Sequence, residues 1–388
     1  MKICFYYPSY NLGGAQLLIY RVASELSKIY EIYIVDFENG FFANRLDGRI
    51  KLLVIKRDQQ LLVEDMKYIV TFPSKIYEIK KLLRPNNNPV VFFWHVHPEN
   101  FLSVFPNLRF QSLSFKYLKI ITIFFRYLEF KSSIKLYDAL LNSGSLVFMD
   151  KPNSDLFFRF YKKIKIEPKY LPVPLKSLFN KRIEYSFTPN KNQIHFFWVG
   201  RLSNQKLPAL RQVIRDLMNL KINKQIYFSV VGKDISLFGC SQLIQLARKR
   251  MTVRFLGEID EKNLPNILKK SCDLLFAMGT SALEGSRIGI PTILLDQISS
   301  NIEKAEGKYI WVHETVGYSL GKVIESKKEL TGKRKLSELI LEFIKSPNNQ
   351  SIKAFQYFEE NHEMASVIRK FLKLLDNSSF RFRDLNLF

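Results

Sequence analysis

The sequence predicts an α/β protein of two successive lobes, each built on a parallel sheet wound with helices, with a ligand site in the cleft between them. Short apolar runs alternate with segments of helical spacing through both halves of the chain, and this alternation favours parallel strands joined by right-handed crossovers. The series starts afresh near residue 194, after the polar stretch 179–193. A length of 388 residues suits two domains, and 47% hydrophobic with 24% charged residues excludes extensive disorder.

The first lobe begins with a buried strand over Lys2–Tyr7, an apolar run that ends at Pro8. A glycine-containing turn then leads into a helix over Gln16–Ile29, whose apolar residues recur at helical spacing. The segments Leu140–Met149 and Lys169–Val173 close the lobe. Between them, the sequence predicts the strands Glu31–Phe37, Ile50–Ile55, Met66–Phe72 and Val90–Trp94 and the helix Ser74–Leu83.

Aromatic and aliphatic residues mix with lysine and arginine between Arg109 and Tyr137, which predicts one or two amphipathic basic helices. Such helices either pack on the sheet or contact an anionic membrane surface through Arg109 to Lys135. The formal net charge of +23 favours anionic partners, although an AT-rich genome would produce a similar composition. The chain carries no helix-turn-helix, RNP or zinc-ligand pattern, so nucleic acid is not an expected partner.

The second lobe repeats the strand–helix alternation, and a long helical pattern over Ser351–Leu375 follows it. The expected strands are Ile194–Val199, Ile226–Val231, Val253–Leu256, Leu274–Ala277 and Thr292–Leu295, and the expected helices lie near Pro208–Leu220, Gln242–Arg250, Asn263–Ser271 and Ser281–Ile288. The tail 376–388 shows no clear period. The expected domains are therefore residues 1–178, residues 193–355 and a C-terminal segment of residues 356–388.

The cysteines Cys4, Cys240 and Cys272 lie far apart, without a CxxC pair or a histidine at metal-ligand spacing. This usage suits a reducing compartment. The apolar run at the N-terminus is too short for a signal peptide, and no segment reaches the roughly 18–20 apolar residues that span a bilayer. We expect a cytoplasmic protein that is either soluble or peripheral on the inner face of the plasma membrane.

Two motifs of the first lobe follow strands, at the edge where α/β proteins bind ligands. Gly13 and Gly14 lie between the first strand and the first helix. Glycine there lets a ligand approach the backbone, and the helix N-terminus attracts anions, although a plain turn is the alternative. His95 and His97 follow the strand Val90–Trp94 and share a face if the chain stays extended. A structural role and a polar role at the cleft are both open, and no third metal ligand accompanies them.

The first motif of the second lobe is Gly200-Arg201, with Lys206 five residues after the arginine. Glycine permits close approach of a ligand, while the arginine fork and the lysine point charge can converge on a diphosphate. The alternative is a pair of solvated charges on a loop.

The second motif of this lobe is Gly279-Thr280-Ser281, where a strand ends and a helix begins. Backbone and hydroxyl groups in this position can donate to a phosphate. Glu284 lies about one helical turn further on, where its carboxylate can accept from ribose hydroxyls or cap the helix.

Taken in order, strand–GGA–helix, a strand-end histidine, GRLSxxK and GTSxLEGxxxGIPT resemble the GT-B fold glycosyltransferases of the large retaining family 4, the group 1 glycosyl transferases. The resemblance covers most of the chain and is strongest from Ile194 to Leu295. It implies two Rossmann-like lobes facing a central cleft, the N-terminal lobe binding the acceptor and the C-terminal lobe the nucleotide sugar. It also implies a C-terminal helix that crosses back to the first lobe.

The resemblance also assigns roles by position. Arg201 and Lys206 would hold the donor diphosphate and neutralise the leaving group. Glu284 would bind the nucleotide ribose, and His95 would contact the sugar near the reacting carbon, with His97 as the alternative. The expected catalytic residues are His95, His97, Arg201 and Lys206, and the expected substrate-binding residues are Gly13, Gly14, Gly200, Gly279, Thr280, Ser281 and Glu284. No Asp-x-Asp occurs in the chain, so we expect neither a metal nor another cofactor.

The chain departs from the family at one position. The family has a first glutamate eight residues before the ribose-binding one, within an E-G-F-G loop, whereas this chain has Phe276. Gly279, Thr280 and Ser281 would replace that loop as phosphate donors. The departure leaves a retaining or inverting outcome open, and it brings the segment closer to UDP-GlcNAc 2-epimerases.

We therefore expect a hexosyltransferase that moves a sugar from a nucleoside-diphosphate sugar to a saccharide or lipid-linked saccharide acceptor. The expected setting is the assembly of a bacterial cell-surface polysaccharide or lipopolysaccharide. One alternative is a non-catalytic nucleotide-sugar-binding protein on a degenerate GT-B frame, which the missing first glutamate motivates. The other is a non-hydrolysing UDP-sugar 2-epimerase, for which the first lobe offers few acid/base carboxylates beyond Glu99.

Overall fold

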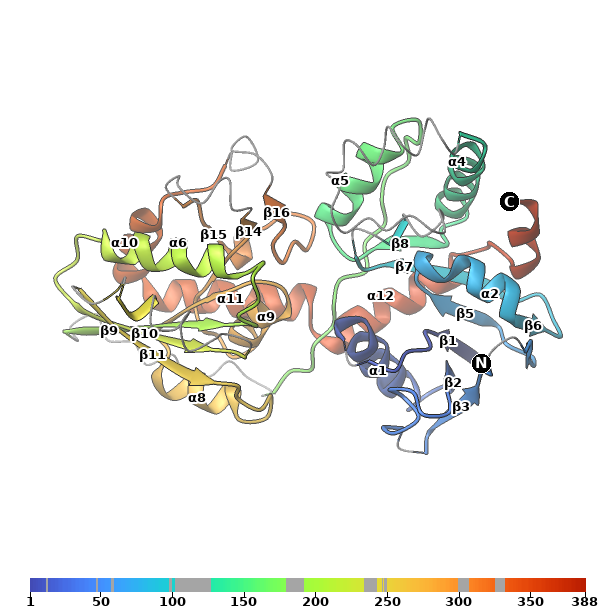
Figure 1. The fold of residues 1–388 in the computed structure, drawn as a ribbon, viewed down its shortest axis with the longest axis horizontal. Helices are drawn as coiled ribbons and strands as arrows, with labels where there is room; N and C mark the ends of the chain where they lie inside the picture. Colours follow the sequence, from blue (N-terminus) through green and yellow to red (C-terminus); the bar gives the residue numbers. More distant parts are fainter. Residues whose placement is uncertain are drawn as a thin grey trace. The chain divides into compact units, whose positions relative to one another are not determined.

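The chain forms two compact units, each with its own sheet and core (Figure 1). Unit 1 comprises Met1–Pro174 and Met364–Phe388, and unit 2 comprises Leu175–Glu363. The computed structural model describes residues 1–11, 13–46, 48–56, 59–97, 100–101, 127–178, 192–233, 243–245, 247, 250–298, 307–324 and 332–388. The stretch 179–193, which separates the two predicted lobes, lies almost entirely outside these residues. Within the predicted helix near Gln242–Arg250, the described residues 243–245 and 247 are helical.

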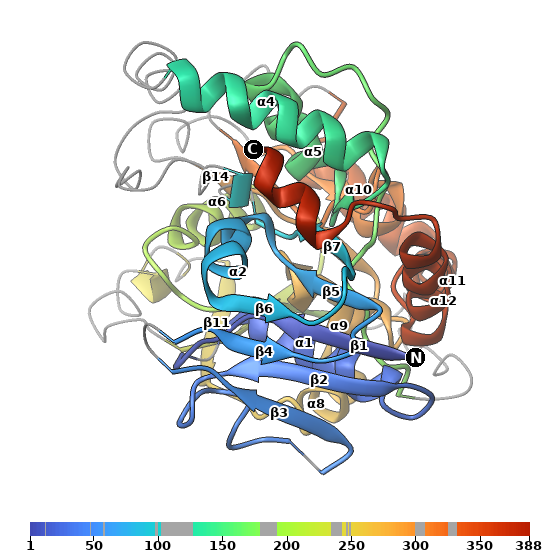
Figure 2. The same cartoon turned by 90° about the vertical axis from the view of Figure 1, so that its right-hand side faces the viewer.

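The sheet of unit 1 is parallel throughout and has the order β3-β2-β1-β5-β7-β8. Its strands are β1 Lys2–Tyr6, β2 Glu31–Asp36, β3 Ile50–Val54, β5 Tyr68–Thr71, β7 Val90–His95 and β8 Leu146–Phe148. Figure 2 shows β3, β2, β1 and β5 side by side. The predicted parallel sheet is thus confirmed. A small parallel pair, β4 Leu61–Val63 with β6 Leu83–Pro85, was not predicted.

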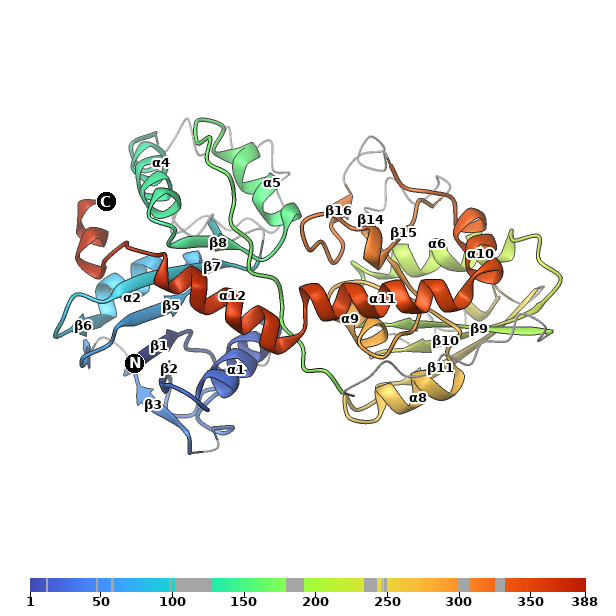
Figure 3. The same cartoon turned by 180° about the vertical axis from the view of Figure 1, so that it is seen from behind.

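Helices cover both faces of this sheet because its strands are apolar on both sides. Ile3 and Phe5 of β1 pack with one face, and Cys4 and Tyr6 with the other. The first face carries α1 Gly14–Leu26 and α12 Met364–Asp376, which lie beside one another (Figure 3). The second face carries α2 Ile76–Leu82, α4 Tyr127–Asn142 and α5 Lys151–Phe160, and the short 3-10 turns of the unit are η1 Pro73–Lys75 and η5 Phe382–Leu387.

The basic segment from Arg109 to Lys135 falls mostly on residues 102–126, outside the described part of the chain. Its last residues open α4, where Lys131 and Lys135 are exposed. Leu128, near the start of the helix, is also exposed, at 79% of its surface. None of the helices that the structure describes is long and apolar enough to cross a membrane.

The sheet of unit 2 has the order β11-β10-β9-β12-β13-β15, parallel except for the edge pair β13–β15. Its strands are β9 Gln193–Val199, β10 Gln225–Val231, β11 Met251–Gly257, β12 Leu274–Ala277, β13 Thr292–Leu294 and β15 Ile310–Trp311. The five predicted strands of this lobe are all present. The two-residue strand β15 and the short pair β14 Gln297–Ile298 with β16 Val323–Ile324 were not predicted.

Two helix layers also enclose this second sheet. Phe196 and Trp198 of β9 pack toward α6 and α10, whereas Phe197 and Val199 pack toward α8, α9 and α11. The helices are α6 Leu207–Met218, α8 Leu264–Ser271, α9 Thr280–Ser286, α10 Leu336–Lys345 and α11 Pro347–Asn361, with the 3-10 turn η3 Val312–Glu314 before α10.

The predicted single helix over Ser351–Leu375 is two helices, α11 in unit 2 and α12 in unit 1 (Figure 3). The helix is interrupted at His362 and Glu363, where the backbone pairs with Leu175. The Leu175 N–H donates to the His362 carbonyl (2.8 Å), and Leu175 forms a β-bridge with Glu363. Residues 356–363 therefore belong to unit 2, and the returning segment starts at Met364 rather than at residue 356.

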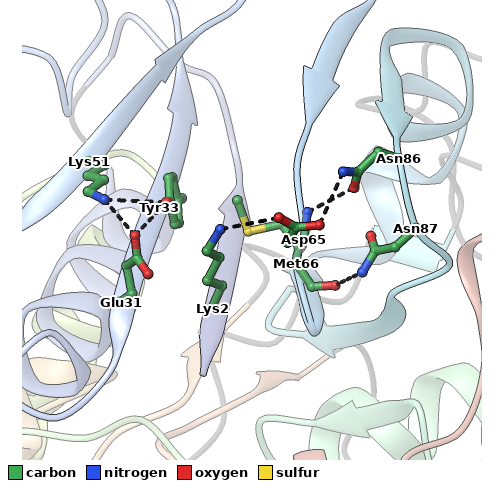
Figure 4. A network of polar contacts seen from close by, with 8 residues as sticks. All are labelled: Lys2, Glu31, Tyr33, Lys51, Asp65, Met66, Asn86 and Asn87. Carbon is green, nitrogen blue, oxygen red and sulfur yellow. Dashed lines mark hydrogen bonds and ion pairs between the residues drawn. The ribbon is translucent and has the colours of Figure 1, made fainter.

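Charged side chains at the amino-terminal edge of the unit 1 sheet form ion pairs with one another (Figure 4). Lys51 Nζ lies 2.5 Å from Glu31 Oε1, and Tyr33 donates to the same oxygen at 2.6 Å. Hydrogen bonds from Lys51 and Tyr33 lower the pKa of Glu31 to about 2. Lys2 pairs with Asp65 at 3.7 Å along the same edge. Ligands of α/β sheets bind at the opposite, carboxyl edge, where the predicted site residues lie.

Candidate functional site

The turn from β1 into α1 carries Gly13 and Gly14. Gly13 is the extended residue that precedes the helix, and a Cβ there would lie 2.7 Å from Gln16 Oε1. Gln16 is buried, and its amide donates to Ser9 Oγ at 2.8 Å. Apart from its chain neighbours and the backbone of α1, no described atom lies within 4 Å of a Cβ built on Gly14. Gly13 thus makes room for a neighbour of its own helix, and Gly14 leaves open space where a ligand can approach.

Asp36, at the carboxyl end of β2, is a site-supporting residue that sequence reasoning missed. Its carboxylate is fully buried and accepts from the Ser9 N–H (2.8 Å) and the Phe42 N–H (2.7 Å). It therefore holds the loops that follow β1 and β2 in place at the carboxyl edge. The signal in the sequence is an aspartate that ends an apolar strand four residues before Gly40, which has no room for a side chain beside it.

His95 lies in the core of unit 1, which corrects the expectation that it contacts a sugar. Its side chain is 0% exposed, and its ring centroid lies 5.7 Å from Phe101, 5.2 Å from Phe148 and 6.1 Å from Phe157. Neither ring nitrogen has a hydrogen-bond partner in the described structure, and burial lowers the pKa of His95 to about 3. A neutral imidazole without surface offers nothing to a ligand in this arrangement.

His97 is the exposed histidine of the pair. The strand β7 continues through His95, and the chain then turns, so the two histidines do not share a face as predicted. The side chain of Asn100 fixes the turn by accepting from the N–H groups of Val96 (3.1 Å) and His97 (2.8 Å). His97 is thus placed at the carboxyl edge of the sheet, and its role toward a ligand stays a prediction.

In unit 2, the backbones that leave β9, β10 and β11 are joined side by side. The Gly200 N–H donates to the Val231 carbonyl (3.0 Å), and the Gly232 N–H donates to the Gly257 carbonyl (2.9 Å). A Cβ on Gly232 would lie 2.0 Å from the Gly200 carbonyl oxygen, a distance at which only glycine fits. This close approach fixes the start of the loop that carries Arg201.

Arg201 and Lys206 place two positive charges near one another at the end of β9. Arg201 is exposed, and Lys206 is half-buried at the N-cap of α6. Burial and the positive charge of Arg201 lower the pKa of Lys206. Neither side chain has a carboxylate partner within the part of the chain that the structure describes. Two neighbouring cations that have no carboxylate partner among the described residues can bind an anion.

The adjacent strand β12 ends at Ala277, and Gly279, two residues further on, precedes α9 with a φ of 64°, in the region that favours glycine. Its N–H donates to the Leu320 carbonyl (2.7 Å), so this group is already used. Thr280 is exposed and Ser281 half-exposed, and no side chain caps the helix. Both residues lie in the first turn of α9, so their hydroxyls remain at the carboxyl edge, just beyond the strand that pairs with β9.

A strap over residues 317–322 crosses the ends of β12 and β13. A Cβ on Gly321 would lie 2.5 Å from the Leu295 carbonyl oxygen. Asp296, which is buried, accepts from the Lys322 N–H (3.0 Å) and pairs with Lys333. Nothing in the local sequence pattern pointed to this strap, since it depends on contacts between distant segments.

Glu284 forms an ion pair with Arg287 one turn further along α9, and both side chains are buried. Arg287 also donates to the Lys176 carbonyl (3.4 Å). The carboxylate predicted to bind a ribose thus has a partner in its own helix, and the ribose contact stays a prediction. Phe276, which occupies the position of the family's first glutamate, is fully buried in β12.

The structure therefore brings Gly200, Arg201 and Lys206 together at the end of β9, beside the Gly279–Glu284 motif at the end of β12. In unit 1 it places the Gly13-Gly14 turn and His97 on the carboxyl edge of the other sheet. Within the described ranges, no three His, Cys, Asp or Glu side chains gather as a metal site requires. Independence from metal stays a prediction.

Comparison with solved structures identifies the fold. No protein-family model and no curated protein sequence matches the chain. The structure of Alr3699/HepE from Anabaena in complex with UDP and glucose is similar over 97% of this chain and 99% of that chain, with 13% identity and a TM-score of 0.54. The complex of the same protein with UDP-glucose gives 13% identity and a TM-score of 0.53 over the same shares.

The ligand-free lipopolysaccharide outer core galactosyltransferase WaaB is similar to the same extent, with 12% identity and a TM-score of 0.54 over 97% of this chain and 99% of that one. At such low identity the likeness shows the fold alone. The chain has the GT-B fold, as its motif order predicted.

Proposed function

We propose that this chain is a glycosyltransferase that moves a sugar from a nucleoside-diphosphate sugar to a saccharide or lipid-linked saccharide. The observation that carries the proposal is the pair of Arg201 and Lys206, two cations without a described carboxylate partner at the carboxyl end of β9. The GT-B fold supports it, since Alr3699/HepE, which shares that fold, binds UDP and glucose in one structure and UDP-glucose in another.

The chemistry of the transfer needs such a pair. The bond between the sugar and the diphosphate breaks, the acceptor hydroxyl oxygen bonds to the sugar as it loses its proton, and negative charge builds on the departing phosphate oxygen. Arg201 can hold two phosphate oxygens as a fork, and Lys206 adds a point charge in a half-buried setting. Fixed cations stabilise the transition state, in which negative charge builds on the leaving diphosphate, more than they stabilise the intact sugar donor. This difference lowers the activation free energy of the transfer.

In this proposal His97 takes the sugar contact first expected of His95, because its ring is exposed at the end of β7. Thr280 and Ser281 supply hydroxyls to the phosphates from the first turn of α9. We also propose that the acceptor is a saccharide or lipid-linked saccharide and that the reaction serves the assembly of a cell-surface polysaccharide or lipopolysaccharide. The fold shared with WaaB supports this part of the proposal.

A thermal-shift screen tests the donor site, with UDP, GDP, ADP, CMP and TDP added in the presence of EDTA and then of Mg²⁺. A ligand at 100 times its Kd stabilises the folded chain by about 2.7 kcal/mol, which raises the melting temperature measurably. We expect one diphosphate to raise it without metal in the wild type but not in Lys206→Ala. Lys221→Ala is the matched control, because this exposed lysine follows the opposite end of α6.

The outcomes separate the candidate functions. The absence of any nucleotide shift would refute the proposal. A shift without release of the nucleoside diphosphate in the presence of its sugar donor and acceptor glycans would favour the non-catalytic sugar-nucleotide-binding alternative. That alternative has one observation in its favour, the Arg287 partner that Glu284 already holds.

A further inference from the structure

The three tryptophans of the chain differ in what their indole N–H groups meet. Trp94 donates to the Leu171 carbonyl at 2.9 Å, and Trp311 donates to Glu342 Oε2 at 3.2 Å. Trp198, the penultimate residue of β9, is 0% exposed, and its Nε1 has no partner among the residues described. Buried indole N–H groups ordinarily find an acceptor, so this vacancy needs an explanation.

The unpartnered N–H lies beside Gly200, two residues along the chain. A Cβ built on Gly200 would lie 3.7 Å from Trp198 Nε1 and 3.8 Å from Lys206 Nζ. No other atom of the described structure, apart from the glycine and its chain neighbours, comes within 4 Å of that point. Glycine therefore leaves a small space, here called the Gly200 nook, that is bordered by two nitrogen donors and, apart from the backbone of residues 199–201, by no acceptor among the described residues.

An oxygen atom of an anion fits the chemistry of the Gly200 nook. Lys206 contributes a positive charge, and Arg201 lies close enough for its own charge to act on Lys206. A third cation would add to this repulsion, whereas the indole N–H donates a hydrogen bond without carrying charge. Phosphate oxygens are strong acceptors for both kinds of donor.

We propose that the Gly200 nook receives a diphosphate oxygen of the sugar donor, and that Trp198 is a binding residue that donates its indole N–H to that oxygen. This inference rests on the proposed function, because it assigns a further contact to the same anion site. It also explains why glycine occupies position 200, since any side chain there would fill the space that the oxygen would occupy.

The first test is an NMR titration of the full chain labelled with ¹⁵N-tryptophan, with UDP and, separately, inorganic pyrophosphate as ligands. The variants Trp94→Phe, Trp198→Phe and Trp311→Phe each remove one indole signal and so assign all three. We expect the Trp198 signal to move downfield with both ligands. The signals of Trp94 and Trp311 should stay in place, because their N–H groups already have acceptors.

The second test is the affinity for UDP by calorimetry. Trp198→Phe keeps an aromatic ring but removes the donor, and we expect the Kd to rise about tenfold, as for a lost hydrogen bond to a charged group. Trp311→Phe is the matched control and should leave the Kd unchanged. Gly200→Ala fills the nook while keeping the indole, and it should abolish the Trp198 response to UDP.

These measurements distinguish failure of the inference from failure of the proposed function. If UDP binds by calorimetry but the Trp198 signal stays in place, the nook holds no phosphate oxygen and the inference is wrong, while the donor site stands. If calorimetry with UDP, GDP, ADP, CMP and TDP detects no binding and pyrophosphate leaves the Trp198 signal unmoved, the proposed function and the inference fall together.

Discussion

His95 shows how the packing of a single polar residue decides its chemistry. The imidazole sits among Phe101, Phe148 and Phe157 without a described hydrogen-bond partner, so protonation would bury an unpaired charge. Burial accordingly lowers its pKa to about 3. At a pH below about 6.5, the ordinary pKa of histidine, His95 is protonated in the unfolded chain but stays neutral in the folded chain. The free energy of unfolding is therefore undiminished by His95 above pH 6.5, and it falls as the pH drops from 6.5 toward 3.

We predict that His95 alone makes the free energy of unfolding about 2 kcal/mol smaller at pH 5 than at pH 7. His95→Phe removes this contribution, and it also removes two unsatisfied ring nitrogens. Urea unfolding of both proteins at the two pH values checks the difference. Burial also lowers the pKa of His313, to about 4. His313 is present in both proteins, so its contribution to the pH dependence cancels in the comparison. An equal loss in wild type and variant would mean that His95 titrates normally in the folded chain.

Residue positions were predictable where local sequence sets them. Gly200, Arg201 and Lys206 follow a strand that is plain from its apolar run, so their place at the carboxyl edge followed directly. The burial of His95 was not predictable, because β7 continues one residue beyond the predicted end at Trp94 and draws the histidine into the sheet. The Glu284–Arg287 pair had a signal that was overlooked, a spacing of three residues on one helix.

At the scale of elements, the buried parallel strands were the most predictable features. β12 Leu274–Ala277 has the predicted bounds, because a strand covered on both faces is an uninterrupted apolar run. The helix α5 was missed although Asp150 caps it by accepting from the Asn153 N–H (3.0 Å). The break between α11 and α12 had no local signal, since neither glycine nor proline occurs there and the pairing partner, Leu175, is distant in sequence.

The helix α10 is held to its neighbours by Glu342, which offers an element-scale prediction. Its carboxylate accepts from Trp311 (3.2 Å), Arg334 (2.7 Å) and Gln350 (2.7 Å). We expect Glu342→Ala to lower the free energy of unfolding by about 1–3 kcal/mol, because three donors lose their acceptor. Glu338→Ala, an exposed position on the same helix, is the control and should change it by less than about 0.5 kcal/mol. Chemical denaturation measures both, and equal effects would show that the network is dispensable.

At the scale of the whole molecule, the net charge of +23 favours association with anionic surfaces. The exposed start of α4 adds Leu128, 79% exposed, near Lys131 and Lys135. We propose that this end of α4 touches anionic lipid, as the basic segment that precedes it suggested. The association would be peripheral and therefore sensitive to salt.

Flotation with liposomes checks this proposal. We expect the chain to float with vesicles of phosphatidylcholine and phosphatidylglycerol, and to stay behind with phosphatidylcholine alone or in about 1 M salt, where the Debye length is about 3 Å. Leu128→Glu should reduce flotation, whereas Leu341→Glu, at an exposed leucine of α10 in unit 2, should not. Recovery of the wild-type chain only in the soluble fraction at low salt would remove the proposal.

The pairing of Leu175 with His362 and Glu363 has a consequence for how this chain can be rearranged genetically. Both ends of unit 2 meet at one point, so the gene segment for residues 175–363 encodes a cassette. Because its two ends lie close together, such a segment is of the kind that tolerates exchange as a unit. Recombination at these two sites would pair an existing unit 1 with a new unit 2 while both hydrophobic cores remain intact.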